Sequence, residues 1–262
     1  MKNNIKLHTE NEFEYMRKAG QLAAECLDYV TDFVKPGVST LELNDICHDF
    51  QTSKGAVPAP LDYKGFPKSV CTSVNHVVCH GIPGSKVLID GDILNIDVTP
   101  VLEGWHGDTS RMFYVGEVKI KAKKLVETTY EAMMRGIEKV KPGNTVGDIG
   151  CAIQNFAEKR KYSVVRDFCG HGLGKVFHDQ PSILHFGKNG EGAVLEEGMF
   201  FTIEPMINIG DYKVKVLSDG WTAVTSDKSL SAQFEHTIGV TNDGFEIFTK
   251  SKKKYDQPPY SI

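Results

Sequence analysis

An internal repeat is the feature that most constrains the fold of this 262-residue chain. The tetrapeptide at 34–37, Val-Lys-Pro-Gly, recurs at 140–143, which is 106 positions later. Each copy is followed at the same spacing by a hydroxyl residue, an acid, an aliphatic residue and a phenylalanine: Ser39, Glu42, Leu43 and Phe50, then Thr145, Asp148, Ile149 and Phe156. Matches at one displacement indicate two structural units built on the same plan.

The residues before each tetrapeptide show the apolar spacing of a helix, over 16–34 in the first unit and 125–140 in the second. Both helices are expected to end at the Pro-Gly pair. Ser39 and Thr145, each followed three residues later by an acid, predict the N-cap of a second helix in each unit.

A second match joins two predicted strands. The segment 91–97 (GDILNID) resembles 198–204 (GMFFTIE), so Asp97 and Glu204 occupy equivalent positions. Chance similarity of short segments is the alternative, but it does not explain several matches at nearly one displacement. Two related α+β halves, about 10–117 and 118–250, would place equivalent strand ends around a shared cleft, where pockets commonly form.

Two aspartates fall on a predicted hairpin. Residues 92–98 alternate as a strand, 102–104 resemble a turn, and 106–115 form the returning strand. With an even number of loop residues, Asp97 and Asp108 share one face. Ionised carboxylates side by side need a proton or a cation to balance their charge, and a metal is the better explanation.

The second half adds more groups of the same kind. Glu204 ends an apolar strand pattern, Glu235 precedes an aliphatic one, and His171 lies in Gly-His-Gly-Leu-Gly. Four carboxylates and one histidine suit two divalent ions that share bridging carboxylates. A single acid at a strand end is more often a turn or cap residue, so the prediction depends on their joint occurrence.

Composition excludes several classes of protein. The net charge of -4 and the pI near 6.1 provide no field that would attract nucleic acid or anionic lipid. No apolar run is long enough for a membrane span or a signal peptide, so a cytoplasmic protein is expected. Lysine-rich stretches at 119–124 and 250–254 are interpreted as solvated faces, and ribosome contact stays open.

The six cysteines form no C-x-x-C pair, so free thiols are expected and structural zinc is disfavoured. A cysteine nucleophile near His76 or His80 is the least favoured reading. The glycine-rich segment 170–174 lacks the spacing of a phosphate loop. His80 and His178 could each be core histidines held by backbone hydrogen bonds.

Seven motifs, in order, resemble those of type I methionine aminopeptidases of metallopeptidase family M24. They are 67–75, 79–83, 95–97, 106–109, 169–174, 201–205 and 233–237. The resemblance covers nearly the whole chain. It implies a pita-bread fold, in which two pseudo-twofold-related α+β halves build a central curved antiparallel sheet flanked by helices. It also implies one catalytic domain over residues 1–262.

The resemblance further implies removal of the initiator methionine from nascent polypeptides, with a preference for a small second residue. Two divalent ions (Co, Mn, Fe or Zn) and a metal-bridging hydroxide as nucleophile are expected, because coordination lowers the pKa of water. The implied metal ligands are Asp97, Asp108, His171, Glu204 and Glu235. Among them, Asp108 and Glu235 would bridge the two ions.

The same resemblance assigns the remaining roles. Glu204 would also transfer protons, while His178 would hold the scissile carbonyl oxygen and His80 the amide nitrogen. The implied methionine pocket consists of Tyr63, Phe66, Cys71, Phe177 and Trp221. A monovalent cation, Na or K, would be held by Asn75, Val77 and Ser231. Two residues depart from the family pattern and bear on substrate preference, Lys64 in place of histidine and Asp62 in place of Asn or Gly.

Three alternatives remain at this point. Proline-specific aminopeptidases would carry a long N-terminal domain, and type II methionine aminopeptidases would carry a late insertion. Non-catalytic binding proteins of the same fold would have lost metal ligands. The expected partners are nascent polypeptide N-termini, and a monomer is expected.

Overall fold

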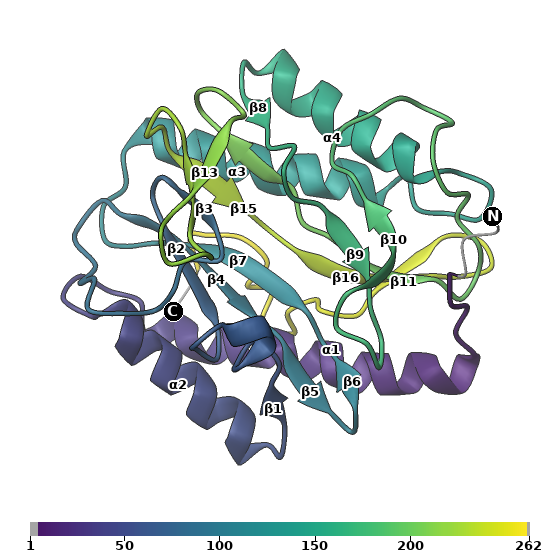
Figure 1. Cartoon of the computed structure of the whole chain (residues 1–262), viewed down its shortest axis with the longest axis horizontal. Coiled ribbons are helices and arrows are strands. Elements are labelled where there is room, and N and C mark those ends of the chain that lie inside the picture. The colour runs from purple at the N-terminus through teal and green to yellow at the C-terminus, as the bar shows by residue number, and fades with distance from the viewer. Residues whose placement is uncertain (1–4, 261–262) are drawn as a thin grey trace.

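The computed structural model describes residues 5–260 and is shown in Figure 1. Its helical elements are α1 (Glu10–Val30), η1 (Thr31–Phe33), α2 (Thr40–Ser53), η2 (Tyr63–Gly65), α3 (Ile120–Ile137) and α4 (Val146–Lys159). The strands of the first half are β1 (Val57–Pro58), β2 (Cys71–Val74), β3 (Val77–Cys79), β4 (Ile93–Val98), β5 (Pro100–Leu102), β6 (Trp105–His106) and β7 (Thr109–Tyr114).

The strands of the second half follow the two teal helices of Figure 1. They are β8 (Ser163–Val164), β9 (Gly170–Gly172), β10 (Asp179–Ile183), β11 (Phe200–Ile203), β12 (Met206–Asn208), β13 (Val214–Val216), β14 (Ala223–Thr225), β15 (Ser231–Gln233), β16 (His236–Val240) and β17 (Phe245–Ile247).

The predicted second helix of each half begins where its capping residue stands. The Ser39 hydroxyl accepts a hydrogen bond from the Glu42 amide, and the Glu42 carboxylate accepts one from the Ser39 amide at 2.8 Å. Thr145 and Asp148 form the same reciprocal pair at the start of α4. The two capping predictions are confirmed, because each box satisfies amides that the first helical turn leaves unpaired.

The predicted ends of the first helices are wrong by a few residues. α1 ends at Val30 and continues as the 3-10 turn η1, while α3 ends at Ile137, so neither helix reaches its Pro-Gly pair. A residue that precedes proline is driven to an extended conformation, so the chain must leave the helix earlier. α1 also begins at Glu10, before the apolar pattern, because Thr9 and Glu12 form another capping box.

Two antiparallel sheets occupy the middle of the molecule. One has the order β2-β4-β7 and the other β10-β9-β11-β16-β17. They meet at an isolated bridge where the Glu235 amide donates to the Ser110 carbonyl at 3.1 Å and the Thr109 hydroxyl donates to the Glu235 carbonyl at 2.6 Å. The expected curved sheet is therefore antiparallel but consists of short sheets linked through this bridge.

Helix pairs cover this layer on two sides. In Figure 1, α1 and α2 lie along the bottom of the molecule and α3 and α4 along the top, with strands between them. One core joins Leu27 of α1 to Phe113 of β7, and another joins Ile149 of α4 to Phe201 of β11. A third core joins Phe13 of α1 to Phe200 of β11, so α1 packs against strands of both halves.

The hairpin register agrees with the prediction. Asp97 is the partner of Ser110, and Asp108 lies two residues before Ser110, so both aspartates lie on one face. The turn is formed by Glu103 and Gly104, whose φ values of 51° and 82° are both left-handed. Positive φ at both central residues matches the right-handed twist of the flanking strands.

Among residues 5–260, no helix is both long and apolar enough to cross a membrane. All six cysteines lie in this range and are free thiols, as expected from their spacing. Four of them are buried, and their packing therefore depends on neighbouring side chains rather than on disulfides.

Candidate metal centre

A cavity of about 370 Å³ opens where the strands of the two halves meet. Asp97 and Asp108 reach its wall from the first half, and His171, Glu204 and Glu235 reach it from the second. All five predicted ligand residues therefore line one cavity, although they are spread over most of the chain.

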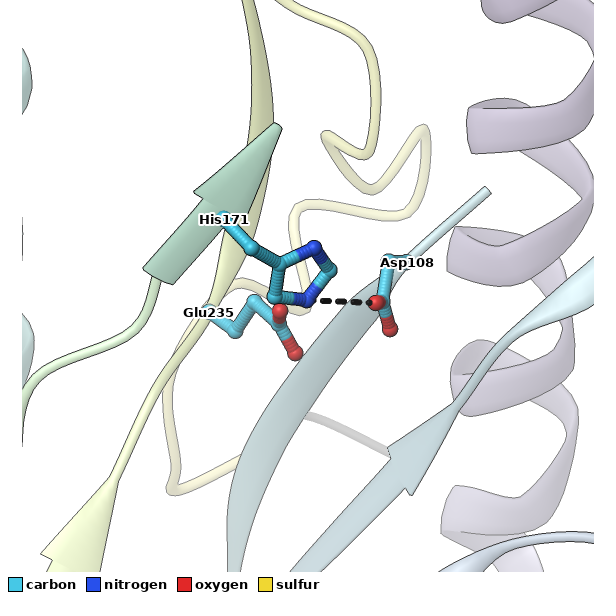
Figure 2. Close-up of side chains that lie close together, drawn as sticks. All are labelled: Asp108, His171 and Glu235. Atoms are coloured by element: carbon cyan, nitrogen blue, oxygen red, sulfur yellow. Dashed lines mark ion pairs between the residues drawn. The ribbon is translucent and has the colours of Figure 1, made fainter. Parts of the chain in front are cut away.

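Three of the five side chains converge closely. One ligand atom from each of Asp108, His171 and Glu235 lies within 4.8 Å of the others. Figure 2 shows these three side chains close together. The dashed line in Figure 2 joins His171 Nε2 to Asp108 Oδ2 at 3.6 Å. These residues come from β9, from the gap between β6 and β7 and from the gap between β15 and β16.

The other two acids adjoin this group. Glu204 Oε1 lies 3.7 Å from His171 Nε2. Burial, with repulsion from neighbouring acids that include Asp97, raises the pKa of Glu235 well above its ordinary value. Asp97 Oδ1 is buried and has no hydrogen-bond partner within residues 5–260. A buried carboxylate oxygen without a hydrogen-bond partner fits a role as a metal ligand, since a bound cation would satisfy it.

Two glycines flank His171 for a steric reason. A Cβ on Gly170 would lie 2.3 Å from the Thr202 carbonyl oxygen, and one on Gly172 would lie 2.0 Å from the Gln180 carbonyl oxygen. Only glycine allows β9 to fit between its neighbours at this distance. The Gly-His-Gly sequence is therefore a packing requirement that holds the histidine between two strands, and not a phosphate loop.

Hydroxyl groups orient two of the carboxylates. The Thr99 hydroxyl donates to Asp108 Oδ1 at 2.7 Å, and the Thr202 hydroxyl donates to Glu204 Oε1 at 2.7 Å. Such hydrogen bonds fix the direction of a carboxylate before a metal binds. The sequence interpretation did not single out these threonines. Thr202 lies two residues before Glu204, and Thr99 lies nine residues before Asp108.

Burial of the acids makes their charge unfavourable without a cation. Burial raises the pKa of Asp108 to about 7 and that of Glu204 to about 8. Burial, with repulsion from Asp108 and Glu204, raises the pKa of Asp97 well above its ordinary value. Burial also lowers the pKa of His171 to about 4, so its imidazole is neutral and can act as a ligand.

The donor set fits divalent metal. Four carboxylates and one neutral imidazole line a single cavity, and when ionised they carry more negative charge than one divalent ion balances. A ligand set of oxygen and nitrogen atoms suits Mn, Fe, Co and Zn.

Two further histidines face the same cavity. His178 Nδ1 lies 3.0 Å from the Tyr63 hydroxyl, and its ring centroid lies 4.1 Å from that of His171. His80 contacts the edge of Phe168 at 5.3 Å between centroids. Burial lowers the pKa of His178 to about 3 and also lowers the pKa of His80. Both rings are neutral hydrogen-bonding groups at the cavity wall, rather than histidines of the core.

The predicted apolar pocket residues line the cavity together. Phe66 and Trp221 meet edge to face with centroids 5.2 Å apart, and Tyr63 and Phe177 lie 4.9 Å apart. Cys71 is the strand partner of Asp97, so the apolar wall adjoins the acids directly. Lining residues that the sequence interpretation missed are Pro60, Lys64 (noted only as a departure), Thr99, Asp167, Phe168, Cys169 and Met206.

The three residues proposed for a monovalent cation lie outside this cavity. The Ser231 amide donates to the Asn75 carbonyl at 2.9 Å, and Val77 lies in the adjacent strand β3. The Asn75 side-chain amide donates to Asp92 Oδ1 at 2.7 Å. Ser231 Oγ is buried and unpartnered among the described residues.

Comparison with known proteins places the chain in a family. A model of metallopeptidase family M24 matches residues 14–242. The chain is 68% identical over 258 residues to methionine aminopeptidase of Rickettsia prowazekii, covering 98% of this chain and 99% of that protein. The chain belongs to the methionine aminopeptidases of family M24. Members of this family are metal-dependent exopeptidases, so the chain is a hydrolase.

Solved structures of the family have the same fold. The crystal structure of methionine aminopeptidase from Rickettsia prowazekii superposes with a TM-score of 0.93 at 67% identity, covering 94% of this chain and 99% of that one. That from Thermotoga maritima gives a TM-score of 0.92 at 40% identity, covering 94% and 100%. Near-complete coverage in both directions leaves no room for a long insertion, as expected of the type I form.

The proline-specific alternative shares only the fold. Prolidase from Pyrococcus horikoshii gives a TM-score of 0.76 at 22% identity, and the matched region covers 94% of this chain but 64% of that one. The pita-bread fold is therefore common to both, while the methionine aminopeptidases match this chain over their full length.

Proposed function

We propose that this chain removes methionine from the N-termini of nascent polypeptides, preferring a small second residue, with two divalent ions in the cavity. The observation that carries the proposal is the convergence of five potential ligand side chains beside an aromatic pocket. The ligands would be Asp97, Asp108, His171, Glu204 and Glu235. The ions would supply charge stabilisation and a more acidic water.

Two histidines would orient the scissile bond. With His178 neutral and the Tyr63 hydroxyl acting as donor to Nδ1, the ring proton would be on Nε2, which could donate to the scissile carbonyl oxygen. His80, on the other wall, would contact the amide nitrogen. The His178 ring is in place before substrate binds, and a donor held in advance favours stabilisation of charge as it develops on the carbonyl oxygen.

Glu204 would move the proton. Its carboxylate, held by the Thr202 hydroxyl at 2.7 Å, would take a proton from the attacking water and deliver it to the leaving nitrogen. The position at the end of β11, beside His171, allows the same carboxylate to serve as ligand and as proton carrier.

The aromatic wall would select methionine. Phe66, Trp221, Tyr63 and Phe177 surround the space beside Asp97, and Cys71 adds a thiol. An unbranched thioether adapts to such a wall and gains sulfur–aromatic contact. The preference for a small second residue follows from the resemblance to type I methionine aminopeptidases.

The metal would be Co, Mn, Fe or Zn. The chain would act as a cytoplasmic monomer with one catalytic domain, and it would bind neither nucleic acid nor membrane. Ribosome contact would bring it to nascent chains.

A Na or K ion would use the carbonyl groups around Asn75 and Val77 and the unpartnered Ser231 Oγ, since the Asn75 side-chain amide already donates to Asp92.

The test is release of free methionine from purified protein. Metal is stripped with chelator, Mn, Co, Fe or Zn is restored, and Met-Ala-Ser, Met-Leu-Ser and Ala-Pro-Ala are supplied. Metal-dependent release from Met-Ala-Ser, absent with Asp97→Ala and retained with the exposed Glu138→Gln, is expected. Cleavage of Ala-Pro-Ala instead would move the activity to the proline-specific class, and no cleavage with any metal would favour a binding protein.

A further inference from the structure

The main chain of Glu204 is held by His185, a buried residue outside the proposed ligand set. β11 ends at Ile203, whose partner is His236, and Pro205 follows Glu204. The Glu204 amide donates its hydrogen bond to His185 Nε2 at 3.1 Å. A side chain therefore takes the place of a strand partner at the residue where the backbone leaves the sheet.

This hydrogen bond fixes the state of the His185 ring. Nε2 can accept only if it carries no proton, so the single ring proton is on Nδ1. The His185 ring is fully buried. The ring is thus an acceptor for the Glu204 amide.

Packing alone does not account for a histidine here. In the part of the chain that the structure describes, Nδ1 of His185 is buried and has no hydrogen-bond partner. A buried unpaired donor is unfavourable, and an apolar side chain of similar size would fill the same space without one. The acceptor at Nε2 is the property that an apolar residue lacks.

The segment that carries His185 is itself held firmly. It follows β10, which pairs with β9, the strand of His171. A Cβ on Gly150 of α4 would lie 2.6 Å from the Leu184 carbonyl oxygen and 2.5 Å from that of Phe186, so the two residues flanking His185 abut the helix. His185 thereby connects the Glu204 backbone to the same β-hairpin that presents His171.

We infer that His185 is a positioning residue that holds the main chain of Glu204 so that its carboxylate points into the metal cavity. The Glu204 side chain is held separately, by the Thr202 hydroxyl on Oε1 and by Gln233 Nε2 on Oε2 at 3.3 Å. Backbone and carboxylate are therefore fixed by different residues. The inference builds on the proposed role of Glu204, and His185 itself contacts no reacting atom.

The test compares two variants of nearly equal shape, His185→Gln and His185→Met, of which only the first retains an acceptor near Nε2. Hydrogen exchange of the Glu204 amide is measured in metal-free protein, Mn affinity by calorimetry, and kcat and KM with Met-Ala-Ser. His8→Met is the control, because His8 is another buried histidine and stacks on Phe200 of the same strand without contacting Glu204.

The Met variant is expected to exchange the Glu204 amide faster, to bind Mn about 10- to 100-fold more weakly and to lose kcat by a similar factor with little change in KM. The Gln variant and His8→Met should stay near the parent protein. Equal behaviour of the Gln and Met variants, or full Mn affinity in the Met variant, overturns the inference.

If the Met variant does not fold, the Gln variant decides. A Gln variant that loses amide protection yet keeps full Mn affinity and kcat overturns the inference, whereas retention of all three supports it. Amide exchange and Mn affinity do not require cleavage of methionine, so failure of the proposed function would be visible separately.

Discussion

Replacing Asp108 by asparagine is expected to remove a pH dependence from the stability of the metal-free protein. Burial raises the pKa of Asp108 from 3.8 to about 7, so the folded protein keeps a proton that the unfolded chain has released. Stability carried by this group is therefore complete below pH 3.8 and is lost as the pH rises through about 7. At 1.36 kcal/mol for each pKa unit, the loss is about 4 kcal/mol.

Urea unfolding in chelator, measured between pH 4 and pH 8, checks this value. The free energy of unfolding of the parent protein should fall by at least about 4 kcal/mol across the range, because the raised pKa of Glu204 acts in the same direction. The decline in Asp108→Asn should be smaller by about 4 kcal/mol. Glu138→Gln, at an exposed acid, should follow the parent protein.

Identical pH dependence in the parent protein and in Asp108→Asn would refute the reasoning. It would mean that the acids are solvated or already compensated in the folded state, so that no cation is required. Addition of Mn provides a second check, since metal competes with protons for the carboxylates. The stabilisation by Mn should therefore increase as the pH rises, and this increase should be smaller in the variant.

Three shorter predictions concern other parts of the molecule. Gly172→Ala should place a methyl group 2.0 Å from the Gln180 carbonyl oxygen, separate β9 from β10 and lower both the melting temperature and Mn affinity. Lys64→Glu, at the exposed cavity rim, should raise kcat/KM for Met-Ala-Lys relative to Met-Ala-Glu by about fivefold, measured in low salt. Ser251→Ala removes a hydroxyl that donates to the buried Asp28 carboxylate, and should cost about 1–3 kcal/mol in urea unfolding without changing KM.

Local signals in the sequence predicted the parts of the fold that depend on neighbouring residues. The caps at Ser39 and Thr145 need only residues three positions away. The shared face of Asp97 and Asp108 needs only the parity of one hairpin. Both kinds of feature are determined by the geometry of a single helix start or turn, so the linear pattern is sufficient.

Features that depend on contacts between distant segments were not predicted. His185 stands between Leu184 and Phe186 and carries no local sign that it accepts from Glu204, 19 residues away. The interruption of the sheet at Glu235 depends on Ser110 of the other half. The convergence of Asp108, His171 and Glu235 within 4.8 Å also depends on how the two halves dock.

The two halves meet at the bridge between Ser110 and Glu235, and their docking determines when during synthesis the metal cavity can form. The first half supplies Asp97 and Asp108, whereas His171, Glu204 and Glu235 come from the second. A ribosome therefore releases most of this chain before the last proposed ligand, Glu235, can join the others. The enzyme cannot gain activity in stages, and a metal ion retained after purification would report that both halves have docked.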